Sequence, residues 1–160
     1  MWERLQRFSR LDAEARGAFL RAAMLLPMIR WSLRFRGFRA TQRSLQNLSF
    51  SSRLARSPAR FPENLAVDHR TCLAVRVVNA AAYHGWGRPT CLEKSLALWW
   101  LLRQMGVTSS VRIGARTSGG RFEAHAWVEC DGAALNEPGE THRHYASFDA
   151  AFPLQGSEIS

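Results

Sequence analysis

The apolar positions of the chain follow a helical period through its first two thirds. In residues 1–48 they recur at spacings of three and four, in patterns that divide around Pro27, which predicts two amphipathic helices. Residues 65–83 show the same period and predict a further helix. Between these regions, residues 49–64 are polar and contain two prolines, which is typical of a linker. We therefore expect an N-terminal helical region, a linker, and a core domain over residues 65–160.

A long apolar helix is predicted from Cys91 to about Met105. Thr90 stands at its N-cap position directly after Pro89, and Gly106 provides a C-terminal stop. The middle of the segment, "LALWWLL", is apolar on every side, which is typical of a helix that is covered on more than one face. This helix is therefore expected to be central in the fold.

After the helix the apolar period changes to two. Residues 111–116 and 121–130 are predicted strands joined through "TSGG", and residues 133–136 are a predicted third strand after the turn "DG". A short strand or turn is expected near "HYASF". Helices followed by an antiparallel sheet predict an α+β fold in which the central helix packs on the sheet.

Length and charge narrow the class of protein. With 160 residues, 46% of them hydrophobic, the chain suffices for one domain with a core. The net charge is +9, and Lys94 is the only lysine, so the positive charge is nearly all arginine. Residues 1–48 contain ten arginines and three acids. Solvated amphipathic helices explain this excess, and docking on a membrane surface or a partner is the alternative.

The cysteine content favours a reducing compartment. Cys72, Cys91 and Cys130 form an odd and sparse set, unlike the dense even sets of small secreted proteins. Residues 1–16 are charged throughout, unlike a signal peptide, and the apolar stretch 22–29 is too short to span a bilayer. We therefore expect a cytoplasmic protein, with Cys72 in the core and Cys130 a thiol without a functional role.

The chemistry of the chain centres on Cys91 and His125. Unpaired N–H groups at a helix start stabilise a thiolate, so a cysteine there is a candidate nucleophile. His125 lies in the predicted strand "EAHAWVE", on the same face as Trp127, between small alanines. If that face looks toward the helix start, the imidazole can accept the thiol proton; the alternative is a structural histidine. Asn136 or Glu137 on the next strand could orient the ring.

Three segments together resemble a known family: "RPTCLEKSLALWWLLRQMGV", "VRIGAR" and "FEAHAWVECDGAALNE". They resemble the transglutaminase-like core of the lasso peptide biosynthesis B proteins, in the stand-alone leader-peptidase form, over roughly residues 67–137. The resemblance implies a papain-like or transglutaminase-like α+β fold. It also implies proteolytic removal of the leader from a ribosomally made precursor peptide.

Carried over by residue, the resemblance makes Cys91 the nucleophile and His125 the general base. The third residue maps to Glu137, in "LNE" where the family usually has "LND", and Asn136 stays the alternative orienting residue. Trp86, on the glycine-bearing loop before Cys91, belongs either to the core or to the substrate cleft. No metal site is expected.

The resemblance also implies partners. A separate leader-recognition protein would hold the leader, and a lasso cyclase would close the ring of the released peptide and use ATP. This chain itself would need no cofactor and bind no nucleic acid. Two alternatives remain open at this point: an acyltransferase in which an amine resolves the thioester, and a non-enzymatic basic adaptor for nucleic acid or membrane.

Overall fold

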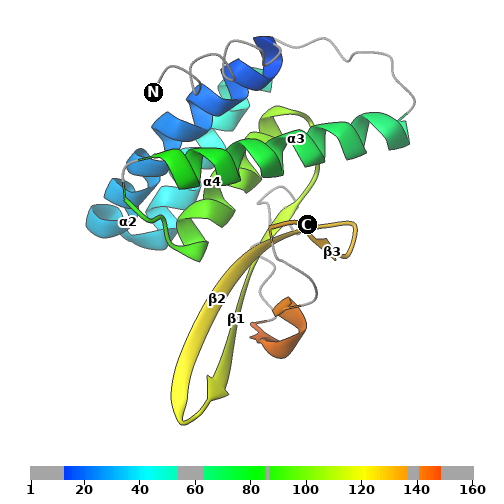
Figure 1. Ribbon diagram of the computed structural model, residues 1–160. Coiled ribbons are helices and arrows are strands. Elements are labelled where there is room, and N and C mark those ends of the chain that lie inside the picture. Colours follow the sequence, from blue (N-terminus) through cyan, green and yellow to red (C-terminus); the bar gives the residue numbers. More distant parts are fainter. Residues whose placement is uncertain (1–12, 54–62, 86, 137–140, 149–160) are drawn as a thin grey trace, which may run out of the picture.

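The computed structural model describes residues 13–53, 63–85, 87–136 and 141–148. The helices are α2 (Ala13–Arg53), α3 (Glu63–His84) and α4 (Cys91–Gln104). The remaining elements are β1 (Ser110–Ser118), β2 (Arg121–Cys130), β3 (Ala133–Ala134), the 3-10 helix η1 (Thr141–His144) and β4 (Ala146–Ser147). The helices gather at one end of the molecule, and the β1–β2 hairpin extends away from them (Figure 1). The α+β class predicted from the sequence is confirmed.

The sheet is antiparallel and has the strand order β3-β2-β1-β4. Gly119 and Gly120 turn the chain between β1 and β2, both with positive φ, as the "TSGG" segment predicts. The predicted strand 133–136 is only half right, because β3 ends at Ala134. Beyond it the Asn136 side chain takes the place of a backbone partner and accepts the N–H of Val128.

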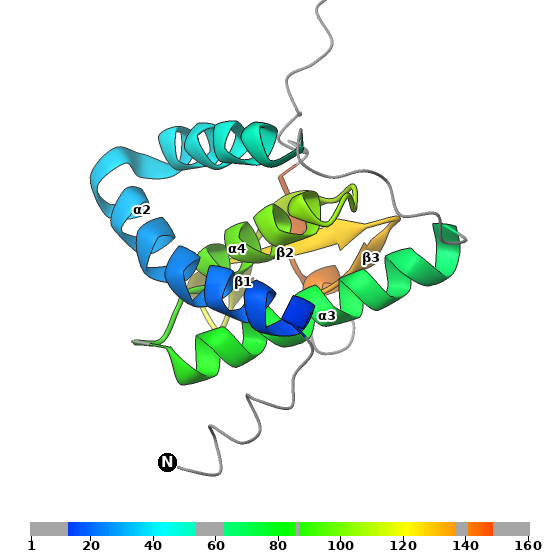
Figure 2. The ribbon, with the colours of Figure 1, turned by 90° about the horizontal axis from the view of Figure 1, so that it is seen from above.

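The predicted division of the N-terminal helices at Pro27 is wrong. The helix continues through Pro27 and is broken instead at Gly37, which has φ of 75° and ψ of 177°. Leu26 and Ile29, on either side of the proline, are buried in the core, and this packing holds the helix together across the missing hydrogen bond. Gly37 tolerates the positive φ because it has no Cβ. Figure 2 shows that α2 changes direction part-way along its length.

The hydrophobic core is built around α4. The buried apolar side chains of this helix are those of Leu96, Ala97, Leu98, Trp99, Leu101 and Leu102. They pack with side chains of α2 such as Ile29, of α3 such as Val78, and of β2 such as Val128. The predicted central position of the helix is thereby confirmed. In the described residues, α2 shares this core with α4.

Two further expectations differ from the structure. The segment predicted as a linker, 49–64, is helical at both described ends, since α2 continues to Arg53 and α3 begins at Glu63. Cys72, expected in the core, is exposed on α3, because the buried stripe of that helix is formed by Ala74, Val77 and neighbours one turn on. Within the described ranges, none of the helices is both long and apolar enough to cross a bilayer.

Candidate active site

Cys91 is the first residue of α4, where a capping box fixes the start of the helix. Thr90 Oγ1 accepts the N–H of Glu93 at 3.3 Å, and Glu93 Oε2 accepts the N–H of Thr90 at 2.9 Å. The first-turn N–H groups that such a cap leaves unbonded are those of Cys91 and Leu92. Cys91 itself is half-buried at this position. The predicted N-cap at Thr90 is confirmed.

An ion pair between Arg30 of α2 and Glu93 of α4 stabilises the start of α4. Arg30 Nε lies 3.1 Å from Glu93 Oε1, and Arg30 Nη2 lies 3.2 Å from Glu93 Oε2, which is a bidentate contact. Arg30 Nη2 also donates to the carbonyl oxygen of Arg88 at 2.6 Å, in the segment that leads to Cys91. Gly87 leaves room for the guanidinium, because a Cβ there would stand 2.5 Å from Arg30 Nη1. One arginine therefore fixes the carboxylate and the loop on either side of Cys91.

A buried polar network joins α4 to the histidine-bearing strand. Ser95, one turn after Cys91, donates its hydroxyl to the carbonyl oxygen of Ala126 at 2.9 Å. Asn136 Nδ2 donates to Ser95 Oγ at 3.1 Å, and Asn136 Oδ1 accepts the N–H of Val128 at 2.7 Å. Ser95 and Val128 are fully buried. The network thus fixes the register between α4 and β2 at the residue next to His125.

Contacts further along show that α4 and β2 run in the same direction. Trp99 Nε1 donates to the carbonyl oxygen of Ser109, and Cys130 Sγ donates to that of Thr108. The later parts of both elements therefore meet the same short segment. Ser95 and Ala126 are bonded nearer the beginnings of α4 and β2. Cys91 and His125 precede these two residues, so they lie toward the same end of the packed helix and strand.

His125 lies among aromatic rings on one face of the sheet. It pairs in register with Gly114, and its ring stacks on Trp127 with 6.3 Å between centroids and lies 5.2 Å from the ring of Tyr145. Val128, of opposite parity, points into the helical core, so His125 and Trp127 share the other face, as the alternation along the strand predicts. The described contacts therefore tie Cys91 to the strand of His125 through Ser95 and do not join the thiol to the imidazole. Gly114 is needed here because a Cβ would stand 2.9 to 3.0 Å from Tyr145, Ala146 and Trp127.

A comparison with known families identifies this arrangement. The family model described as the transglutaminase-like superfamily matches residues 32–148, which is more than half of the chain. The chain belongs to the transglutaminase-like superfamily. Neither a curated protein nor a solved structure matches it. The superfamily and the fold expected from the sequence are confirmed, and the match also includes the second half of α2 and all of α3.

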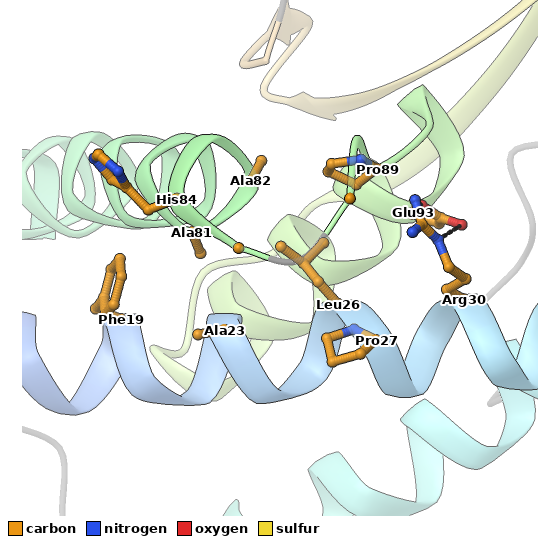
Figure 3. Close-up of a pocket in the computed structure, with 12 residues that line it drawn as sticks. Phe19, Ala23, Leu26, Pro27, Arg30, Ala81, Ala82, His84, Pro89 and Glu93 are labelled. Carbon is orange, nitrogen blue, oxygen red and sulfur yellow. Dashed lines mark hydrogen bonds and ion pairs between the residues drawn. The ribbon is translucent and has the colours of Figure 1, made fainter.

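A pocket opens beside the start of α4 (Figure 3). It has a volume of about 410 Å³ and lies between α2, the end of α3 and the segment before Cys91. Phe19 and His84 stand toward one end, and the Arg30–Glu93 pair stands at the other. Most of its lining is apolar. Trp86, the candidate cleft residue, lies outside the described residues, although the glycines on both sides of it line the pocket.

The other candidate groups are placed as follows. Cys130 is buried, and burial raises the pKa of its thiol above the ordinary value, with a further rise from the neighbouring Asp131 carboxylate. It is therefore a protonated thiol at neutral pH and a poor nucleophile. His142 packs against the ring of Trp127. In the part of the chain that the structure describes, no cluster of three or more His, Cys, Asp or Glu side chains could hold a metal ion. Glu137 lies outside that part.

The sequence patterns did not indicate two residues that position α4, namely Arg30 and Ser95. Arg30 lies 63 positions from Glu93, and nothing in the local pattern of α2 distinguishes it from the other arginines. Ser95 had a signal: it is a polar residue at the border of the apolar run "LALWWLL", where a buried hydroxyl must find a partner. Both act on the placement of Cys91 and His125 rather than on the chemistry itself.

The network at Asn136 gives a first prediction. Asn136→Ala removes the side-chain acceptor of the buried Val128 N–H and the donor to Ser95, so we expect the free energy of unfolding to fall by about 1–3 kcal/mol. Urea denaturation measures this change. Asn79→Ala, at an exposed asparagine of α3, should leave stability unchanged. Loss of activity with full stability in Asn136→Ala would instead assign this residue to the orientation of His125.

Proposed function

We propose that the protein is a cysteine peptidase that removes the leader peptide from a ribosomally made lasso peptide precursor. The transglutaminase-like superfamily includes cysteine peptidases and acyltransferases, which makes a thiol nucleophile the expected chemistry. The observation that carries the proposal is the half-buried Cys91 at the capped start of α4, tied through Ser95 to the strand of His125. The segments around both residues resemble those of the lasso peptide leader peptidases.

In the proposed mechanism Cys91 attacks the carbonyl carbon at the junction of leader and core. His125 takes the thiol proton, and the C–S bond forms as the carbonyl oxygen becomes an oxyanion. The first-turn N–H groups of Cys91 and Leu92 are suited to stabilise that oxyanion. His125 then protonates the leaving amine as the C–N bond breaks, which releases the core peptide. Water, deprotonated by His125, hydrolyses the remaining thioester of the leader.

Glu137 is proposed to orient the imidazole of His125. Both polar groups of the Asn136 side chain already bond to other parts of the molecule, Oδ1 to the Val128 N–H and Nδ2 to Ser95. This favours a positioning role for Asn136 and leaves the carboxylate of Glu137 for the ring. A carboxylate would also stabilise the imidazolium that forms during attack.

The partners proposed from the resemblance are a separate leader-recognition protein and an ATP-dependent lasso cyclase, with the reaction in the cytoplasm. In this scheme the chain requires no cofactor of its own, and ATP is used by the cyclase. The apolar pocket beside Pro89 is suited to an apolar side chain of the precursor, because it lies next to the segment that leads into Cys91.

The proposal is tested by incubating the purified chain with precursor peptide and its recognition protein. We expect one cleavage, with the leader released as a free carboxylic acid, measured by mass spectrometry. A leader joined to an added amine, in place of the acid, would assign the protein to the acyltransferases. Intact precursor after incubation with an active recognition protein would contradict both activities and favour a non-enzymatic adaptor.

A further inference from the structure

The first part of α2 is apolar on two separated faces. One face, with Ala22, Leu25 and Ile29, is buried in the core. The other carries five large apolar side chains that are 53% to 68% exposed. They are Leu20, Met24, Met28, Trp31 and Phe35, here called the outer stripe.

The outer stripe is a continuous feature of the helix surface. At roughly 100° of rotation per residue, its five side chains fall within an arc of about 80°, on the side away from the buried face. The rings of Trp31 and Phe35 are in contact, with 4.9 Å between centroids. Exposed apolar side chains are ordinary when scattered singly, whereas an aligned row over four turns marks an interaction surface.

The exposed charged side chains described along the margins of the outer stripe are arginines. Arg34 and Arg16 border one margin of the arc and Arg21 borders the other, and all three are exposed. Over its whole length α2 contains eight arginines and one acid, Glu14. One of these arginines, Arg30, is committed to the ion pair with Glu93. An apolar row between exposed arginines is complementary to a surface that carries negative charge on the outside and has an apolar layer beneath it.

We propose that the outer stripe docks the protein on the surface of an anionic lipid bilayer. The apolar side chains would enter the boundary between headgroups and acyl chains, with Trp31 at the level that tryptophan prefers, and the bordering arginines would contact lipid phosphates. The helix would lie in the plane of the membrane, since the described helices do not span it. A protein partner with a mixed-charge rim would match this face less well, because the exposed charged side chains described at its border are all arginines.

Docking is tested by sedimentation of the full-length protein with vesicles. We expect wild type to pellet with vesicles of phosphatidylcholine and phosphatidylglycerol in equal parts and to stay in the supernatant with phosphatidylcholine alone. Met28→Gln/Trp31→Gln should abolish binding to the anionic vesicles. Arg21→Gln/Arg34→Gln should lower the partition coefficient by about 30-fold, because each basic side chain near an anionic surface contributes to binding.

Matched variants at the tip of the β1–β2 hairpin control for composition. Phe122 and Arg121 are also exposed, and the hairpin tip lies far from α2 (Figure 1), so Phe122→Gln and Arg121→Gln should bind as wild type. Wild type that stays in the supernatant with anionic vesicles would overturn the proposal. So would a folded Met28→Gln/Trp31→Gln variant that still pellets, or a stripe variant whose only change is lost self-association, which would reassign the stripe to contact between copies.

Discussion

Replacement of Cys91 by alanine is expected to reduce leader cleavage by roughly 10³-fold or more while leaving the fold intact. The nucleophile is lost, and no other thiol can substitute, because Cys130 is buried with a raised pKa and Cys72 is on the exposed side of α3. The cleavage rate is measured by mass spectrometry of the released leader. Circular dichroism and the urea midpoint should match wild type, since Cys91 is only half-buried at the helix start.

Cys72→Ala is the matched control for this result, because it removes an exposed cysteine from another helix and should cleave as wild type. His125→Ala should show a loss similar to that of Cys91→Ala, with His69→Ala, at an exposed histidine of α3, as its control. Cleavage at the wild-type rate by Cys91→Ala or by His125→Ala would contradict the proposed mechanism.

Arg30→Met is expected to destabilise the protein, because it removes the ion pair that holds the start of α4. Glu93 is buried, with 6% of the residue exposed, and without Arg30 its carboxylate keeps the Thr90 N–H as its one hydrogen-bond partner among the described residues. Removing one partner of a buried pair costs about 3–5 kcal/mol, and the partial exposure of Arg30 reduces this to about 2–3 kcal/mol. The contact with the Arg88 carbonyl is also lost, so the segment before Cys91 loosens and cleavage slows.

Urea denaturation of Arg30→Met measures the loss, and Arg34→Met, at an exposed arginine one turn along α2, provides the matched control. The double variant Arg30→Met/Glu93→Gln should recover much of the stability. Glutamine at this position keeps the capping box with Thr90 and carries no charge to leave unpaired. Equal stability of Arg30→Met and Arg34→Met would show that the ion pair does not hold the start of α4.

Local patterns predicted most elements because they depend on neighbouring residues. The N-cap at Thr90, the glycine turn "TSGG" and the alternation along β2 each follow from backbone preferences within a few positions. The predicted division of the helix at Pro27 was wrong because burial of the residues on both sides of the proline stabilises the helix by more than one missing hydrogen bond costs. The predicted length of β3 was wrong because the side chain of Asn136, and not a further strand residue, accepts the N–H of Val128.

The sequence by itself determined that a cysteine begins an apolar central helix and that a histidine stands on a strand, together with the likeness to a transglutaminase-like core. Only the tertiary structure decided that Arg30 holds the start of α4, that Ser95 and Asn136 fix the register between helix and strand, and that one apolar face of α2 stays uncovered. The physical reason is that these contacts join residues tens of positions apart. A periodic pattern shows which side of a helix is apolar, but the packing of the other elements decides which apolar side is buried.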